Sequence, residues 1–223
     1  MKSGRALATI FVKKKDGKLR LCADYRALNE VTTKDRHPLP LICEALDRLG
    51  GGKYFTKLDI NGAYHNIRIR EGDKWKTTFS TKVGTYKYLV MPFGLCNAPA
   101  GFQGWITEVL IKHMDRYCII YLDDVLIYSD TIHQHRKAVS NILEARRDSG
   151  MKVERCKCEF HKSETEYLGF IIRQEGVKRD PVMTQAIRDW KNPKKMKEIE
   201  CSLRFCNFYR RFIEGFSRTA RQL

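Results

Sequence analysis

The sequence lacks an apolar run of about 18 residues, the length at which a segment becomes a candidate membrane-spanning helix. We therefore expect no membrane partner. It also lacks a signal-peptide cleavage site, since the basic N-terminus holds only a short apolar patch at residues 6–12, which we interpret as a strand. No internal repeat or low-complexity tract is visible, and 43% of the residues are hydrophobic. Repeat architectures and a disordered tail are therefore excluded.

Acidic residues are scarce relative to basic ones. The 223 residues include 26 Asp and Glu against 42 Lys and Arg, which gives a formal net charge of +16. Such a balance predicts a polyanionic partner, and nucleic acid is the first choice because phosphate contacts dominate such affinities. Ribosomal and membrane-surface proteins can be equally basic, so charge alone does not decide. The 8 Cys are scattered, several of them inside apolar runs, which is typical of reduced intracellular thiols.

A zinc centre is disfavoured. Cys156, Cys158 and His161 have the spacing of half a zinc site, but no second ligand pair of conventional spacing exists. His133 and His135 stand two positions apart, so a helix would place them on different sides. We predict both to be surface residues.

Hydrophobic patterning in the first half predicts strands and helices in mixed order. Apolar residues alternate over residues 7–23 around an Asp-Gly step, which predicts a β-hairpin with a lysine-rich tip. Pro38 and Pro40 stand at the start of residues 39–49, which place later apolar side chains on one helix face. Residues 64–69 alternate weakly and are open between strand and turn-helix, whereas residues 77–90 are β-rich.

The second half continues this α+β pattern. Asn97, with a proline two positions later, is predicted to cap a helix. Asp130 is predicted to cap another helix that closes at Gly150, and residues 166–172 are predicted to form a strand. The pattern becomes helical near residues 178–182, where we place a domain boundary.

Two adjacent carboxylates stand in the most informative segment. Residues 117–128 (YCIIYLDDVLIY) are two apolar β-prone runs with Asp123 and Asp124 at the bend, which predicts a β-hairpin. Two carboxylates at such a tip repel each other unless a cation neutralises them. Mg²⁺ is commonly held by one or two carboxylates together with substrate phosphates. An Asp-Asp turn chosen for its turn propensity is the plainer alternative.

A third carboxylate favours the metal site. Residues 57–60 (KLDI) follow a glycine-rich break and an aromatic pair, and they predict a short buried strand that ends near Asp59. Burying an Asp among apolar residues costs free energy without a partner or a metal. Asp59 can share a metal with Asp123 only if their strands are neighbours in a sheet. Metal pairs clamped by such carboxylates are the usual apparatus of in-line phosphoryl transfer, which is our leading hypothesis.

Together these motifs resemble the reverse transcriptase domain of Gypsy-type LTR retrotransposons and, more distantly, retroviral reverse transcriptases. The matching segments run through nearly the whole chain: FVKKKDGKLRLCADYRALN, LPLICEALDRLGGGKYFTKLDINGAYHNIRI, YLVMPFGLCNAPAGFQ, YLDDVLIYSD, KCEF, YLGF and FCNFYRRFI. The resemblance implies a right-hand polymerase fold, with an antiparallel sheet backed by helices. Fingers and palm would occupy residues 1–178, and residues 179–223 would begin the helical thumb or connection.

The resemblance also implies the cofactor and its ligands. The family's metal site is matched here by Asp59, Ile60, Asp123 and Asp124. Two Mg²⁺ ions, or Mn²⁺ in their place, would bind to Asp59 and Asp123, with Asp124 as a third, more weakly coordinated carboxylate. Lys157 in KCEF occupies the position from which a lysine can protonate the departing pyrophosphate.

Substrate contacts follow from the same resemblance. Lys14 and Arg20 match the fingers residues that grip the triphosphate, where Arg offers a planar fork and Lys a point charge. Tyr64 would form the floor under the nucleotide sugar and exclude a 2′-hydroxyl. Phe93 and Gly94 match the segment that packs against the nucleotide and the template base, with the glycine permitting close backbone approach.

A further segment resembles the primer grip, a hairpin that sets the primer terminus. It comprises Tyr167, Leu168 and Gly169, although an ordinary core strand explains its apolar residues equally well. Asn97 and Gln103 are expected to be structural or to lie on the template side.

The sequence therefore predicts an RNA-directed DNA polymerase whose partners are an RNA template, a DNA primer and dNTPs. The family's finger strands before FVKKKDG are missing, and the chain ends before an RNase H or integrase domain, so we expect a fragment of a parent polyprotein. The alternatives are a catalytically defective nucleic-acid-binding remnant and a metal-dependent nuclease that uses the same carboxylates. Replication of such an element implies the cytoplasm and nucleus, and the basic N-terminus leaves an organelle open.

Overall fold

The structure, a computed structural model, has an α+β architecture. No helix in the described part of the chain has the length and apolar character needed to cross a membrane. The described residues are 7–13, 17, 19–49, 51–179, 181, 185, 188–190, 193 and 195–221.

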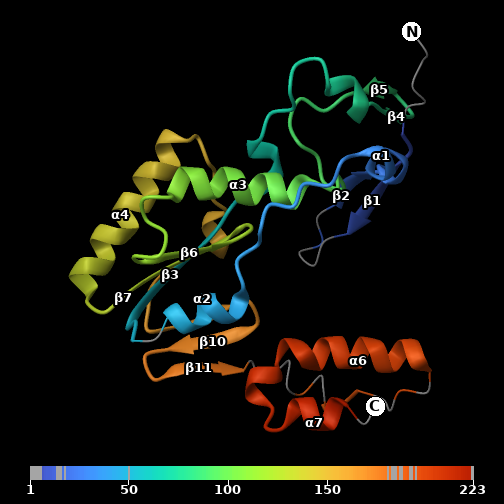
Figure 1. Ribbon diagram of the computed structural model, residues 1–223. Helices are drawn as coiled ribbons and strands as arrows, with labels where there is room; N and C mark the ends of the chain where they lie inside the picture. The colour runs from blue at the N-terminus through green and yellow to red at the C-terminus, as the bar shows by residue number, and fades with distance from the viewer. Residues whose placement is uncertain are drawn as a thin grey trace.

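The centre of the molecule is a four-stranded antiparallel sheet with the strand order β6-β7-β3-β8, which we call the palm sheet (Figure 1). Its central pair, β3 and β7, comes from segments far apart in the sequence, so the sheet joins the KLDI and YLDD segments as the sequence analysis required. The strands are β3 (Tyr54–Asp59), β6 (Cys118–Tyr121), β7 (Asp124–Ser129) and β8 (Glu159–Lys162).

Each face of the palm sheet is covered by a different layer, because successive side chains of a strand point to opposite faces. Leu58 and Ile127 pack on the face beneath two long helices, α3 (Ala98–Leu110) and α4 (Ile132–Asp148). On the other face, Phe55 packs with residues of α2, of the β9-β10-β11 sheet and of the C-terminal helices. These elements are α2 (Ile42–Arg48), β9 (Glu164–Tyr167), β10 (Phe170–Arg173), β11 (Gly176–Arg179), α6 (Met196–Phe208) and η4 (Arg210–Phe212). Helix α7 (Phe216–Ala220) follows them in the chain.

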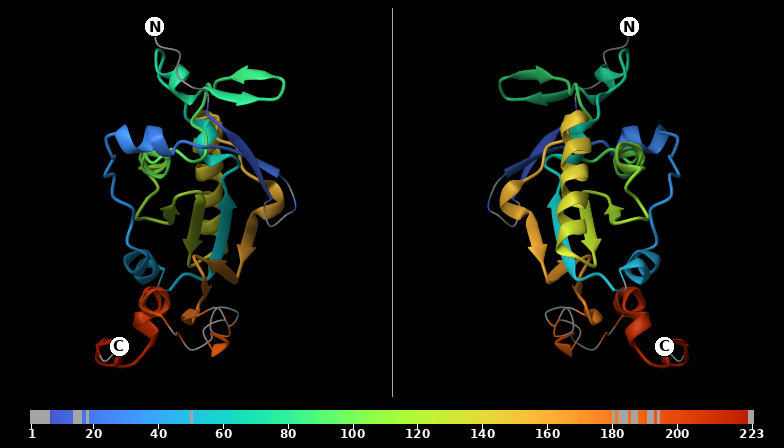
Figure 2. Two further views of the ribbon diagram at one scale, coloured as in Figure 1. Left: turned by 90° about the vertical axis from the view of Figure 1, so that its right-hand side faces the viewer. Right: turned by 90° about the vertical axis from the view of Figure 1, so that its left-hand side faces the viewer.

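Two β-hairpins and helix α1, all from the first half of the chain, extend the molecule away from the palm sheet. Figure 2 shows these N-terminal elements at one end of the molecule and the C-terminal helices at the other. Two hairpins lie there, β1-β2 and β4-β5, joined by a bridge between Leu7 and Phe79. The elements are β1 (Thr9–Lys13), β2 (Leu19–Ala23), α1 (Arg26–Val31), β4 (Phe79–Thr81) and β5 (Gly84–Tyr86). Short 3-10 helices are η1 (Ala63–Asn66), η2 (Lys74–Thr77), η3 (Arg155–Lys157) and η4 (Arg210–Phe212).

Neither of the two residues predicted as helix caps makes a capping hydrogen bond with its side chain. Helix α4 begins after Thr131, whose hydroxyl accepts a hydrogen bond from the Gln134 backbone, so the predicted Asp130 cap is wrong by one position. Asn97 does precede α3, but its side chain accepts from the Asp35 backbone N–H and donates to the Thr33 carbonyl. Asn97 therefore occupies the N-cap position as predicted, but its side chain joins the 33–35 segment to the start of α3 and makes no capping hydrogen bond.

The predicted strand over residues 166–172 is interrupted by a turn. Leu168 and Gly169 both have positive φ angles, 52° and 79°. Two consecutive residues of this kind form the tight turn that suits a two-residue β-hairpin. The segment is therefore the β9-β10 hairpin, with Tyr167 paired to Phe170 across the turn.

His135 is buried, contrary to the prediction of a surface residue. It has 0% exposure, and its Nε2 lies 2.8 Å from the Thr56 hydroxyl oxygen on β3. His135 shares the buried face of α4 with Ala138, Val139 and Ile142, at helical spacing. The histidine thus contacts the palm sheet because it extends that apolar face by one turn toward the N-terminus.

This burial predicts an acid sensitivity of the fold. Burial lowers the pKa of His135 from 6.5 to about 4. Between those values the unfolded chain binds a proton that the folded chain does not, so stability falls as the pH falls. We expect wild type to lose about 2 kcal/mol more than His135→Gln between pH 7 and pH 5, measured by urea unfolding. The exposed His133→Gln variant is the control, and an identical pH slope in all three proteins would contradict the prediction.

Candidate active site

The palm sheet brings the three predicted carboxylates to one end. Asp59 and Asp124 are directly paired at the last position of the β3-β7 ladder. Asp123 lies in the adjoining two-residue turn between β6 and β7, and its carbonyl accepts a hydrogen bond of 3.0 Å from the Ile60 backbone N–H. The strands that carry these acids are therefore neighbours, which is the condition for a shared metal centre.

The turn that carries Asp123 has an unusual backbone. Leu122 has a φ of 52°, a conformation that costs a bulky L-residue about 1 kcal/mol or more. The Leu122 backbone N–H donates a hydrogen bond of 2.8 Å to the side-chain oxygen of Gln103, which is 1% exposed on α3. Gln103 thus holds the turn from beneath and leaves Asp123 exposed at its tip. This agrees with the expected structural role of Gln103.

Burial and mutual repulsion raise the pKa of two of the carboxylates. Burial and the neighbouring Asp123 raise the pKa of Asp124 to about 6. Burial also raises the pKa of Asp59, against the opposing effect of Lys157, whose ammonium lies 3.6 Å from the Asp59 carboxylate. Desolvated, mutually repelling carboxylates bind protons more readily, and a bound cation would relieve the same repulsion.

Seven of the predicted residues line one cavity beside these carboxylates. They come from the β1-β2 hairpin, the end of β3, η1, the loop before α3, the β6-β7 turn and η3. The residues are Arg20, Asp59, Ile60, Tyr64, Phe93, Asp123 and Lys157.

Aromatic and basic side chains pack against one another in this cavity. The rings of Tyr64 and Phe93 lie 5.0 Å apart, and the Arg20 guanidinium carbon lies 4.2 Å from the centre of the Phe93 ring. The Tyr64 ring also contacts buried Phe102 on α3 edge-on, at 6.0 Å. The cavity therefore has an aromatic wall and is also lined by a guanidinium and by carboxylates.

Gly94 has a backbone role that the structure makes visible. Its φ is 100°, and a Cβ added there would lie 3.3 Å from the Tyr25 ring. The Gly94 carbonyl accepts a hydrogen bond of 2.8 Å from the Asn29 side chain. The glycine allows the chain after Phe93 to turn against α1, and it does not itself line the cavity.

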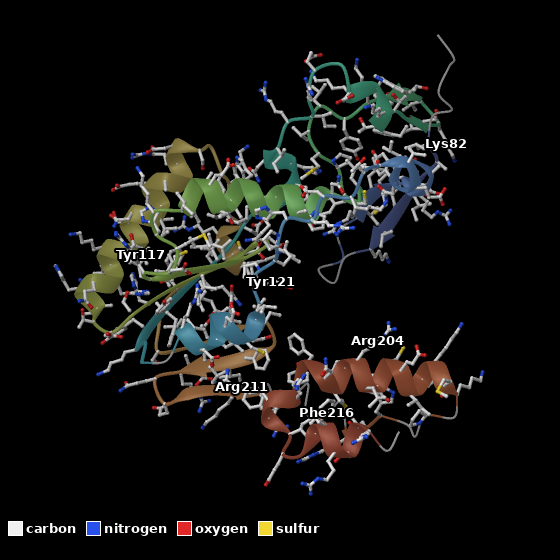
Figure 3. The ribbon with its side chains drawn as sticks, viewed as in Figure 1. Lys82, Tyr117, Tyr121, Arg204, Arg211 and Phe216 are labelled. Carbon is white, nitrogen blue, oxygen red and sulfur yellow. The ribbon has the colours of Figure 1, made fainter. Side chains whose placement is uncertain are left out.

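The β9-β10 hairpin lies against the face of the palm sheet that carries Asp124. The Tyr167 hydroxyl donates a hydrogen bond of 3.4 Å to the Asp124 carbonyl, and Tyr167 is 1% exposed. Figure 3 shows Tyr121 on the side of the sheet toward the C-terminal helices, and Tyr121 packs with the same cluster as Tyr167. Tyr167 contacts the strand that carries Asp124, and the hairpin tip at Leu168 and Gly169 comes immediately after it in the chain.

Some predicted residues lie apart from the cavity, and others were missed. Asp124 and the hairpin residues do not line the cavity, and Lys14 lies outside the described residues. The cavity also contains Glu154, which contributes to the raised pKa of Asp59, and His65. Glu154 belongs to no recognisable motif, and only its position three residues before Lys157 could have indicated that it lies near the cavity.

The chemistry of the lining residues fits a divalent cation that a substrate helps to hold. Among the described residues, no group of three His, Cys, Asp or Glu side chains has the geometry to hold a metal ion by itself. Asp59 and Asp123 nevertheless face one cavity, and their carboxylates are of the type that binds Mg²⁺ together with phosphate oxygens and water.

Comparison with known proteins agrees with this geometry. The model of the family described as reverse transcriptase (RNA-dependent DNA polymerase) matches residues 12–172. The chain is 39% identical over 206 residues to the retrovirus-related Pol polyprotein from transposon 297 of Drosophila melanogaster, covering 92% of this chain and 20% of that protein. It is 36% identical over 222 residues to the transposon Tf2-3 polyprotein of Schizosaccharomyces pombe, covering 100% of this chain and 17% of that protein. The chain thus spans about a fifth of the length of these curated relatives.

Solved structures show the same fold. The foamy viral protease-reverse transcriptase in complex with double-stranded DNA aligns with a TM-score of 0.89 and 25% identity, over 97% of this chain and 38% of that one. The same viral protein in complex with an RNA/DNA hybrid aligns with a TM-score of 0.77 and 24% identity, over 91% and 27% of the two chains. The family match covers well over half of the residues, with the carboxylate-bearing strands inside it. The chain belongs to the reverse transcriptase (RNA-dependent DNA polymerase) family.

Proposed function

We propose that this chain copies an RNA template into DNA by transferring nucleotides from dNTPs to a primer 3′-hydroxyl, with two divalent cations as cofactors. The pairing of Asp59 with Asp124, with Asp123 in the adjoining turn, carries the proposal. The aromatic wall of the cavity and the +16 net charge support a nucleotide substrate and a nucleic-acid partner.

Asp59 and Asp123 would hold the cations, with the backbone of Ile60 beside them and Asp124 as a weaker, half-buried ligand. When bound, Mg²⁺ or Mn²⁺ would acidify the primer hydroxyl and neutralise charge on the nucleotide phosphates. The protein's own contribution is to hold these carboxylates fixed, through the β3-β7 ladder and the bond between Gln103 and the turn.

The cavity wall would position the nucleotide. Arg20 stacks on Phe93 and presents its guanidinium for the triphosphate, and we infer that Lys14 assists it. Tyr64, fixed between Phe93 and Phe102, would lie under the sugar and leave no room for a 2′-hydroxyl. Lys157 is 60% exposed next to Asp59, where its ammonium can donate a proton to the departing pyrophosphate.

We also infer the division of the chain. The fingers and palm would occupy residues 1–178, and the thumb or connection would begin at 179. The support is that β11 ends at Arg179, whereas α6, η4 and α7 are the elements described beyond residue 195.

Loss of one carboxylate should abolish synthesis. We expect Asp123→Asn to slow primer extension on an RNA template by about 10³-fold or more, since it removes a ligand of the reaction centre. Binding of the primer-template should change little, because Asp123 carries no positive charge with which to bind the phosphates. Asp130→Asn, an exposed change of the same kind outside the cavity, should retain wild-type extension.

Three outcomes of this assay are informative. Extension that disappears only in Asp123→Asn supports the proposal. Binding without extension in the wild type would identify a nucleic-acid-binding remnant. Shortening of a labelled strand would identify a nuclease.

The aromatic floor should set sugar selectivity. We expect Tyr64→Val to admit ribonucleotides, lowering the preference for dNTP over rNTP by about tenfold or more, because the side chain next to the sugar becomes smaller. Tyr64→Phe keeps the ring and should keep the preference. Single-nucleotide incorporation kinetics with matched dNTP and rNTP measure the ratio, and a Tyr64→Val enzyme that still refuses ribonucleotides would contradict the assignment.

The carboxylate cluster should destabilise the metal-free fold at neutral pH. The folded pKa of Asp124 is raised from 3.8 to about 6, so the folded state binds a proton more readily and stability rises as the pH falls through 6. We expect Asp124→Asn to be more stable than wild type by roughly 2 kcal/mol at pH 8 without divalent cations. Urea unfolding should show this advantage shrinking toward pH 4, with Asp130→Asn as the control. An advantage that does not depend on pH would contradict the prediction.

A further inference from the structure

A lysine on the carboxylate strand reaches across to the β9-β10 hairpin. Lys57 lies two positions before Asp59 on β3, so both side chains point to the same face of the palm sheet. The Lys57 ammonium donates a hydrogen bond of 3.0 Å to the backbone carbonyl of Glu166 on β9. Its side chain is only 20% exposed. Lys57 thus links the catalytic strand directly to the backbone of the hairpin.

A carboxylate and a hydroxyl hold this lysine in place. Glu159 on β8 is the cross-strand neighbour of Lys57, and one carboxylate oxygen lies 3.9 Å from the ammonium. The other oxygen accepts a hydrogen bond of 2.8 Å from the Thr165 hydroxyl on β9, where Thr165 is 3% exposed. The polar groups of Lys57, Glu159 and β9 therefore satisfy one another at the junction of two sheets. A lysine that only solvated the surface would have no such arrangement.

A second contact runs the opposite way across the same junction. The Tyr167 hydroxyl of the hairpin donates to the Asp124 carbonyl of the palm sheet, whereas Lys57 of the palm sheet donates to the Glu166 carbonyl of the hairpin. Glu166 and Tyr167 are adjacent, and the turn at Leu168 follows at once. The two contacts therefore fix the tip of the hairpin relative to the strand ends that carry the carboxylates.

We propose that Lys57 is a positioning residue for nucleotide transfer, which holds the β9-β10 hairpin, and through it the primer terminus, at the correct distance from Asp59. The inference rests on the proposed function, because it takes the hairpin to be the primer grip. Lys57 does not contact the reacting groups. Its effect follows from geometry, since a displacement of about 1 Å at a reacting centre can cost about 10²-fold in rate.

The test compares three variants of the full 223-residue chain. Lys57→Met keeps the length of the side chain and removes its charge and donors. Lys57→Arg keeps the positive charge and the hydrogen-bond donors and should retain the activity. Lys53→Met removes the same charge from an exposed lysine immediately before the same strand, so it controls for net charge. The measurements are the single-turnover rate of dNTP addition, the KM for dNTP, the Kd for primer-template, and amide hydrogen exchange over residues 164–173.

The expected result separates positioning from binding. Lys57→Met should lower the maximal rate by about tenfold or more, while the dNTP KM and the primer-template Kd stay within about threefold of wild type. Exchange of the hairpin amides should accelerate by a similar factor, because the Glu166 carbonyl loses its donor. Lys57→Arg should recover the rate to within about threefold, and Lys53→Met should match wild type in every measurement.

The outcomes distinguish this inference from the proposed function. A wild-type chain that extends no primer would overturn the proposed function, and hydrogen exchange would still show whether Lys57 anchors the hairpin. Active wild type with an unchanged Lys57→Met rate would overturn the positioning role alone. A Lys57→Met effect confined to the primer-template Kd, or hairpin exchange equal to that of Lys53→Met, would also overturn it.

Discussion

The pairing of β3 with β7 in one register is the constraint on which the rest of the structure depends. A shift of one residue would move every side chain of a strand to the opposite face of the sheet. In the observed register, Asp59 is opposite Asp124, and the Ile60 N–H reaches the Asp123 carbonyl. The same register puts Leu58 beneath the helices and Lys57 toward the hairpin. Carboxylates, core and hairpin contact are therefore set by one choice of strand alignment.

The site concentrates free-energy costs that the surrounding fold compensates. Leu122 has a left-handed backbone, and Asp59 and Asp124 are partly desolvated next to another acid. Strain and perturbed pKa values of this kind gather where a ligand or a reaction makes use of them. Buried Gln103 and the strands beneath the turn supply the opposing stabilisation. Under the proposed function, the cost in folding stability would be offset when a cation binds.

The sequence predicted the parts of the structure that depend on local chemistry and missed those that depend on tertiary packing. The hairpin around Asp123 follows from two β-prone runs and a polar bend, and the structure confirms it. His135 was judged by helix geometry alone, whereas its burial depends on which face of α4 meets the sheet. The hairpin at Leu168 was expected from the family resemblance alone, because a bulky residue gives no turn signal and the residue pattern by itself predicted an unbroken strand. The pairing of Lys57 with Glu159 could not be predicted from the sequence, since β3 and β8 lie far apart in the chain with several elements between them.

Gly169 gives the hairpin a particular relation to the C-terminal helices. A methyl group at this position would lie 3.3 Å from the Tyr209 hydroxyl, and Tyr209 packs on Phe170 of the same hairpin. The helical segment therefore meets the hairpin in two ways: the Tyr209 hydroxyl leaves no room for a side chain at position 169, and the rings of Phe208, Tyr209 and Phe212 pack on Phe170. A rotation of the helices would be transmitted to the hairpin as a shift of its backbone, so movements of the two parts are mechanically linked at this contact.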